Sequence, residues 1–172
     1  MGLFGKSKKE LLEWQNMVLS PPSKKLVMSE AQLRKISLPI AQNSLRILKE
    51  SGQLCESTKK PDVFFSRYKL MIQHAQYLVA LSRFISFSGT TPKAVLDQAI
   101  EKRPLLIKQL IDRCFSDAEL LKTDSAKAKR YTKILNDFSP YRVEIDNWNW
   151  NYLESICHQK KENGTKTSKS KK

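Results

Sequence analysis

The stretch PDVFFSRYKLMIQHAQYLVALSRFISF, residues 61–87, carries the clearest helical pattern in the chain. Pro61 suits the first turn of a helix, and Asp62 favours the positive end of the helix dipole. One broad apolar face recurs at helical spacing, and three further apolar residues widen it: Phe64, Tyr68, Met71, Ile72, Ala75, Leu78, Val79 and Ile85, then Phe65, Leu81 and Phe84. We therefore predict a central helix that is buried on more than one side.

The segment before this helix predicts a second helix over residues 29–52. Pro39 lies inside that segment and is expected to kink or split the helix, because a proline removes a backbone donor. Gly52 is a natural stop at the C-terminal end, and residues 53–60 are then a connecting loop. The apolar stripe of this helix consists of Leu33, Ile36, Ile40 and Ile47.

After the central helix, Thr91 predicts the cap of a long helix over residues 92–122, which Pro104 should bend. A junction at 123–125 leads into a basic helix that ends before Ser139 and Pro140. Its apolar side is formed by Tyr131, Ile134, Leu135 and Phe138. A last helix is expected over residues 143–158.

The ends of the chain differ in character from this middle part. Ser7 predicts the cap of a short N-terminal helix, whose apolar residues Leu11, Trp14 and Val18 recur at helical spacing. Two prolines then end it, in the sequence Ser20–Pro22. Beyond residue 158 the chain contains no apolar side chain, which is typical of a disordered tail.

The predicted architecture is therefore all-α: a bundle of four or five main helices with proline bends. We expect three parts along the 172 residues. Residues 1–28 form an amphipathic segment and linker, residues 29–158 the helical bundle domain, and residues 159–172 a disordered basic tail.

Composition limits the compartment and the partners. The formal net charge is +14, and more than half of that excess lies in the two ends of the chain, where simple solvation is its commonest role. Cys55, Cys114 and Cys157 are an odd number without CxxC spacing, so neither a disulfide framework nor a zinc site is indicated. With no secretory signal expected, the sequence favours a reducing, cytoplasmic location.

Three short motifs follow one another between residues 45 and 138: FFxRY in one predicted helix, IDR in the next helix and LKT at a junction. Their residues are Phe64, Phe65, Arg67 and Tyr68, then Ile111, Asp112 and Arg113, then Leu121, Lys122 and Thr123. This order resembles a pattern in uncharacterised helical proteins of bacteria and phages. The resemblance implies a helical fold and no particular activity.

Arg67 stands among aromatic residues in an otherwise apolar run, which admits two interpretations. It could bind a ligand, or it could support the fold. In the second case its stem could lie on the rings with the head near water, or its charge could pair with a carboxylate of a neighbouring helix. We favour the second and hypothesise a partly buried ion pair between Arg67 and Asp112 of the following helix. Such a pair would contribute packing specificity more than net stability.

The sequence DNWNWNYLE, residues 146–154, combines asparagines with aromatic residues, which can stack nucleic-acid bases or sugars. On a helix, however, Trp148 and Tyr152 share a face, and aromatic residues at this spacing usually pack. We therefore expect Trp148 and Tyr152 to fill the bundle and Trp150 to cover a seam. If exposed, Trp150 is a candidate for contacting a partner.

A local basic cluster completes the candidate partner surface: Lys122, Lys127, Lys129, Arg130 and Lys133. It could bind phosphates, although a solvated helix face is the simpler interpretation. Catalysis has no convincing set of residues here, and no cofactor or metal is expected. His74 is expected to be a hydrogen-bonded histidine in the core or at its boundary instead of a base.

These observations predict a non-catalytic helical protein that presents a groove between bent helices to another protein. One alternative is association with nucleic acid through the basic tail and the basic cluster. Another, less favoured, is peripheral attachment to a membrane through apolar and basic residues of the N-terminal segment: Leu3, Phe4, Lys6, Lys8, Lys9, Leu11 and Trp14.

Overall fold

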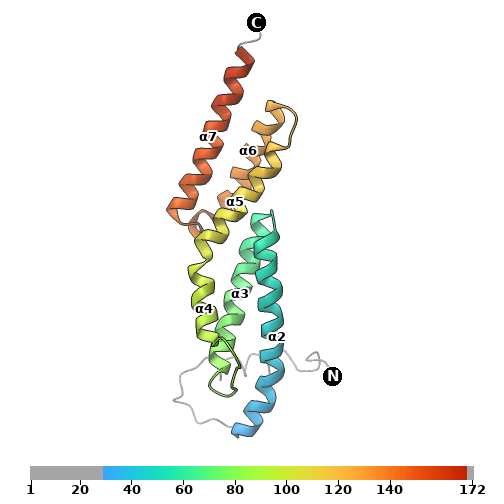
Figure 1. Cartoon of the computed structure of the whole chain (residues 1–172), viewed down its shortest axis with the longest axis vertical. Helices are drawn as coiled ribbons and strands as arrows, with labels where there is room; N and C mark the ends of the chain where they lie inside the picture. Colours follow the sequence, from blue (N-terminus) through green and yellow to red (C-terminus); the bar gives the residue numbers. More distant parts are fainter. Residues whose placement is uncertain (1–28, 170–172) are drawn as a thin grey trace. The chain divides into compact units, whose positions relative to one another are not determined.

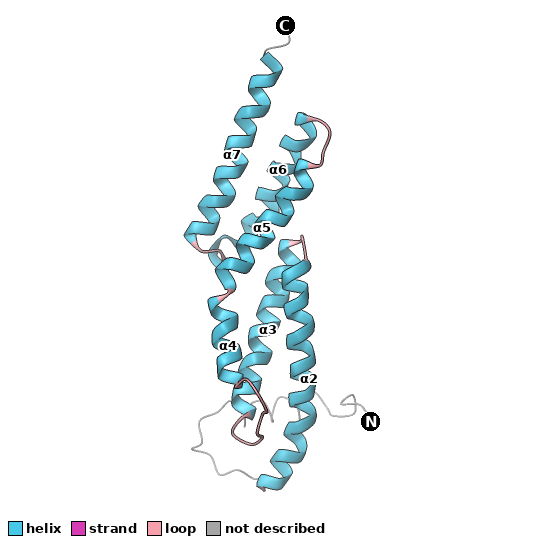
Figure 2. Ribbon diagram, in the orientation of Figure 1, coloured by secondary structure: helices cyan, strands magenta, loops and turns pink. Residues whose placement is uncertain are grey.

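The structure, a computed structural model, describes the backbone of residues 29–169 and the side chains of residue 29 and residues 31–158. Every regular element in this part is helical (Figure 1, Figure 2). The α-helices are α2 (Glu30–Ser57), α3 (Pro61–Leu81), α4 (Pro92–Glu101), α5 (Arg103–Glu119), α6 (Asp124–Phe138) and α7 (Asn147–Lys169), with the 3-10 helix η2 (Ser139–Glu144). The prediction of an all-α fold is confirmed.

The described residues form two compact units. The first unit contains residues 29–51 and 69–100, and the second contains residues 52–68 and 101–169. Both α2 and α3 contribute residues to each unit, whereas α4 lies almost wholly in the first unit and α5, α6 and α7 lie in the second. The predicted boundaries at residues 29 and 158 stay a prediction.

In the first unit, α2 packs on α3 through small residues. The buried positions Ser37, Ala41 and Ser44 follow one another at intervals of four and three residues, the spacing of a coiled-coil seam. On α3 the buried residues Met71, Ala75 and Leu78 follow the same rule. Ala41 packs with Leu78 in the core, and Ser44 Oγ lies 3.0 Å from His74 Nδ1, so this face of α2 is directed toward α3.

The apolar stripe that the sequence predicts for α2 is therefore only part of its buried face. Leu33 is buried, but Ile36, Ile40 and Ile47 are half-buried at the margin of the seam. The core of the first unit combines buried residues with partly buried ones around them: Ala41, Leu78 and Leu81, then Ile36, Ile40, Leu48, Ala80, Phe84, Ile85 and Phe87.

The second unit has an aromatic core. The Phe64 ring meets Phe65 edge-on, with centroids 5.1 Å apart, and lies over Tyr68 at 6.0 Å. Phe65 in turn stacks on Tyr141 at 4.4 Å. Helix α6 packs against both α5 and α7. The buried residues of these three helices are Leu106, Ile107, Leu110, Ile111, Cys114, Phe115 and Ala118, then Tyr131, Ile134 and Phe138, then Asn149, Leu153 and Cys157.

The predicted split of α2 at Pro39 and its predicted end at Gly52 are wrong. Pro39 does not split the helix, and its side chain is exposed, so the ring faces solvent. Gly52 does not end it either, because α2 continues through Ser57 and buries Cys55 on the way. The expected loop over residues 53–60 is reduced to residues 58–60.

Two further helix boundaries differ from those predicted from the sequence. Helix α3 ends at Leu81 instead of near Phe87. The helix predicted over residues 92–122 is two helices, α4 and α5, separated at Lys102. Pro104 lies in the first turn of α5, where the missing N–H has no intrahelical partner to lose, so the expected single bent helix is divided into two at Lys102.

The predicted junction at residues 123–125 contains the N-terminal cap of α6. The Oγ1 atom of Thr123 accepts a hydrogen bond from the backbone N–H of Ala126 at 3.2 Å. Helix α7 begins at Asn147 and continues through Lys169, beyond the predicted end at His158. The backbone of the expected tail is thus helical over residues 159–169, and residues 170–172 lie outside the described part.

The predicted N-terminal helix and linker, residues 1–28, also lie outside the described residues. Across residues 29–169, no helix combines the length and the apolar character that crossing a membrane requires.

Candidate protein-binding groove

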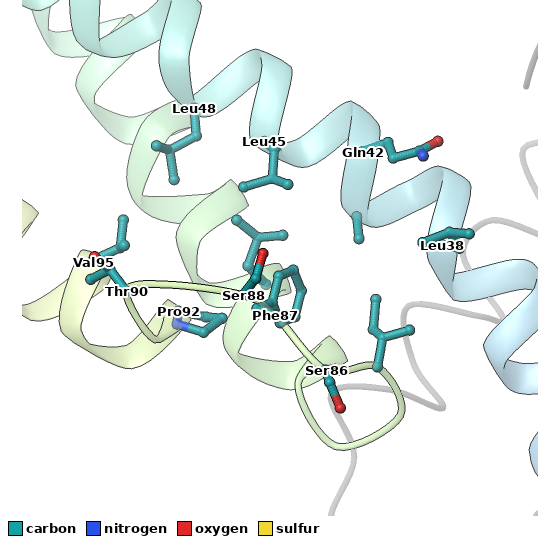
Figure 3. A pocket seen from close by; sticks show the side chains of 13 residues that line it. Leu38, Gln42, Leu45, Leu48, Ser86, Phe87, Ser88, Thr90, Pro92 and Val95 are labelled. Carbon is teal, nitrogen blue, oxygen red and sulfur yellow. The ribbon is translucent and has the colours of Figure 1, made fainter.

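An open groove of about 300 Å³ lies in the first unit (Figure 3). Its walls come from α2, from the loop over residues 82–91 and from the start of α4, and its floor comes from buried core residues of α2 and α3. The lining residues are Leu38, Ala41, Gln42, Leu45, Leu48, Leu78, Ile85, Ser86, Phe87, Ser88, Thr90, Pro92 and Val95.

One wall of the groove is a row of leucines on α2. Leu38, Leu45 and Leu48 lie at intervals of seven and three residues, so they follow one face of the helix next to the seam with α3. In Figure 3 the side chains of Leu45 and Leu48 point from α2 toward the loop and the start of α4. Leu38 and Leu45 are 52% and 47% exposed, although they lie beside the core of the first unit. The row is therefore available for contact.

The opposite wall is formed where the chain turns from α3 into α4. Gly89, in the loop between α3 and α4, adopts a φ of 87°. This value lies in the left-handed region that favours glycine. The Oγ1 atom of Thr91 then accepts a hydrogen bond from the backbone N–H of Ala94 at 3.3 Å, as predicted from its capping position. This fixed turn places Phe87, Pro92 and Val95 along the groove.

The chemistry of the groove is mainly apolar. None of its lining residues is charged, and its polar groups are the side chains of Gln42, Ser86, Ser88 and Thr90 at the rim. Residues 29–158 contain no group of three or more metal-binding side chains. The arrangement is suited to taking up apolar side chains, and it offers little for binding a charged ligand.

The predicted ion pair between Arg67 and Asp112 is wrong. Asp112 instead accepts hydrogen bonds from Lys108 Nζ and from the Tyr152 hydroxyl, both at 2.7 Å. Arg67 is exposed on the surface of α3. The apolar neighbours of Arg67 in the sequence turn inward, while its own position on the helix points to solvent.

Arg113, the second arginine of the quoted motifs, has the fold-supporting role that was predicted for Arg67. It is half-buried, and its guanidinium donates from Nε to the carbonyl of Thr58 and from a terminal nitrogen to the carbonyl of Cys55, both at 3.0 Å. The last carbonyls of a helix have no partner within it, and a cation there complements the helix dipole. Arg113 therefore caps the C-terminal end of α2.

The aromatic residues of α7 also differ from the prediction. Trp148, expected in the core, is 61% exposed and stacks on Tyr152 with ring centroids 5.5 Å apart. Trp150 is half-buried, and the Arg142 guanidinium lies 4.9 Å from its ring centroid. The buried residue between the two tryptophans is Asn149.

Asn149 is fully buried and was missed from the sequence. Its side-chain amide donates to the carbonyl of Pro104 and to Asp146 Oδ2, both at 2.8 Å, and Asp146 Oδ1 accepts from its backbone N–H at 3.0 Å. These bonds lower the pKa of the Asp146 carboxyl against the opposing effect of burial. The only hint in the sequence was its position four residues before the apolar Leu153.

The predicted basic cluster is a surface feature of α6 and the turn before it. Lys122, Lys129 and Lys133 are exposed, whereas Arg130 is half-buried. Lys127 is also half-buried and lies 3.9 Å from Glu119. Two exposed lysines one turn apart are compatible with solvation or with a phosphate contact.

Cys55 and Cys114 offer no reactive thiolate. Cys55, Cys114 and Cys157 are free and buried. Burial raises the pKa of Cys55 and of Cys114 to about 11, so both remain thiols at neutral pH.

His74 is a hydrogen-bonded residue at the edge of the core, as the sequence indicated. Its Nδ1 lies 3.0 Å from Ser44 Oγ, and its ring meets Tyr77 edge-on. Burial lowers the pKa of His74 below its usual 6.5. The folded state therefore binds the proton less readily than the unfolded state, so His74 costs stability as the pH falls below 6.5 and costs nothing at higher pH.

We accordingly expect the stability of the wild-type chain to fall more steeply than that of a His74→Gln variant between about pH 7 and about pH 5. Urea unfolding of both chains at several pH values measures the difference. Parallel pH profiles for the two chains would contradict this assignment.

Compared with models of protein families, with curated proteins and with solved structures, the chain matches none of them.

Proposed function

We propose that the protein is a helical interaction module that binds an apolar helix of a protein partner in the groove of the first unit. The observation that carries the proposal is the row Leu38, Leu45 and Leu48 on α2, of which the first two are exposed, facing an apolar wall. An amphipathic helix buries residues at intervals of three and four in such grooves, and this mode of recognition needs no charged anchor.

The groove favours a protein over a small polar ligand for a chemical reason. A small-molecule site has a few convergent polar groups that fix the ligand's orientation. Here the polar side chains lie at the rim, and the described lining residues have no charge. As part of this proposal we place the interaction in the cytoplasm, because the three cysteines are buried free thiols.

Site-specific cross-linking tests the proposal. A photo-reactive p-benzoylphenylalanine replaces Gln42, which is exposed and lines the groove, and the full chain is irradiated in its host cell. The cross-linked partner segment is identified by mass spectrometry and synthesised as a peptide. We expect an amphipathic helix whose binding weakens at least about tenfold when Leu45 is replaced by Asp.

The matched control is Leu120→Asp, because Leu120 is 81% exposed on the other unit. It should leave peptide binding unchanged. A peptide that binds the Leu45→Asp variant as well as the wild type would refute the proposal, as would cross-links from Gln42 to nucleic acid or lipid only.

Nucleic-acid binding through α6 is a second candidate, supported by the exposed Lys129 and Lys133 one helical turn apart. Replacing both with Glu should then reduce retention on RNA or DNA and flatten its dependence on salt. Retention that is unchanged by these substitutions would remove α6 from consideration. The resemblance to bacterial and phage-associated proteins likewise stays a prediction.

A further inference from the structure

We propose that the chain's own N-terminal segment, residues 7–19, folds as a helix into the groove of the first unit, so that a partner must displace it. This inference rests on the proposed function, since it names the resident occupant of the same groove. It follows from three observations: the leucine row of α2 with its exposed Leu38 and Leu45, the position at which the described chain begins, and the apolar pattern of the segment before it.

The groove lies on the element that directly follows the N-terminal segment. The described chain begins at Ser29, one residue before α2, and the leucine row begins at Leu38 on that helix. With a rise of about 1.5 Å per residue, Leu45 lies about 24 Å along α2 from Ser29. The linker, residues 20–28, reaches about 30 Å when extended. The segment can therefore return along α2 as far as the middle of the groove.

The segment presents the kind of surface that the groove accepts. Leu11, Trp14 and Val18 lie at intervals of three and four residues, so a helix would place them on one side. Asn16 would lie on the opposite side of that helix. A large aromatic residue flanked by two aliphatic ones is a common anchor set, and the uncharged lining of the groove imposes no electrostatic penalty on them.

The covalent connection makes even a weak contact effective. A short linker holds the segment at an effective concentration in the millimolar range. The segment can therefore occupy the groove of its own chain even if it would bind only transiently as a separate molecule. An external helix then competes against this internal one, and its apparent affinity falls by the fraction of molecules in which the groove is closed.

The experiment uses the full chain with p-benzoylphenylalanine in place of Gln42, purified and irradiated at low protein concentration. We expect a cross-link to residues 7–19 within one molecule, seen at the mobility of a monomer on a denaturing gel. A triple variant with Leu11→Asp, Trp14→Asp and Val18→Asp should lower its yield at least about tenfold. The matched control Asn16→Asp should leave the yield unchanged, and the same photo-reactive residue in place of Gln109, exposed on α5, should give no such product.

Three outcomes would overturn the inference: no cross-link to the segment, a cross-link found only between two copies of the chain, or an equal yield from the triple variant. The partner peptide from the preceding test separates this inference from the function. If both hold, the triple variant binds that peptide about tenfold more tightly than the wild type. A partner peptide that binds both chains equally refutes the internal occupant and leaves the function standing, whereas an internal cross-link without any external partner does the reverse.

Discussion

Replacing Phe64 with alanine is expected to lower the free energy of unfolding by about 3–5 kcal/mol. Phe64 is completely buried, and its ring contacts those of Phe65 and Tyr68. Alanine at this position removes the apolar transfer energy of the ring and leaves a cavity among side chains fixed on a rigid helix, which limits how far they can move to fill it.

Urea unfolding followed by far-ultraviolet circular dichroism measures this loss. The control is Val143→Ala, because Val143 is 93% exposed and its substitution should change the free energy of unfolding by less than about 0.5 kcal/mol. A similar small change in the Phe64→Ala variant would show that the aromatic core is not packed as described.

Replacing Arg113 with methionine is expected to lower the free energy of unfolding by about 2–4 kcal/mol, because two hydrogen bonds from a charged donor are lost. Methionine preserves much of the apolar stem and removes only the fork that binds the carbonyls of Cys55 and Thr58. The final turn of α2 should fray, since its carbonyls lose their partners and the favourable cation at the end of the dipole.

Hydrogen exchange locates this loss, with faster exchange expected over residues 53–60 than elsewhere. Arg113→Lys keeps the charge but cannot reach both carbonyls in the same way, so it should lose an intermediate amount. Arg46→Met is the matched control, because Arg46 pairs with Glu50 on an exposed helix face and should contribute less than about 1 kcal/mol. Equal losses for Arg46→Met and Arg113→Met would refute the capping role.

The comparison of Arg67 with Arg113 shows why the candidate site was only partly predictable. Both arginines stand within apolar runs, and the sequence offers no means of ranking them. The outcome depended on which faced the end of α2, and that is a property of how helices distant in the sequence pack. Asp112 illustrates the same point, because its partners are Lys108 on its own helix and Tyr152 on α7.

The groove was expected in kind but not in place. The sequence predicted a groove between helices bent by prolines, yet Pro39 leaves α2 continuous and the groove is walled by exposed leucines and a turn. The sequence predicted that large aliphatic residues form the buried face of α2, whereas two serines and an alanine form the seam with α3. Hydrophobic periodicity cannot recognise such a seam, because buried serines have the same pattern as exposed ones.

By itself, the sequence determined the helical class, the start of a helix at Pro61, the cap at Thr91 and the junction at residues 123–125. These features depend on spacing and backbone chemistry within a few residues, so a linear reading contains their physical cause. Only the tertiary structure decided that Trp148 is exposed, that Asn149 is buried, that Arg113 caps α2 and that the leucines of α2 line a groove. Each of these depends on the surface that another helix presents, which no local pattern specifies.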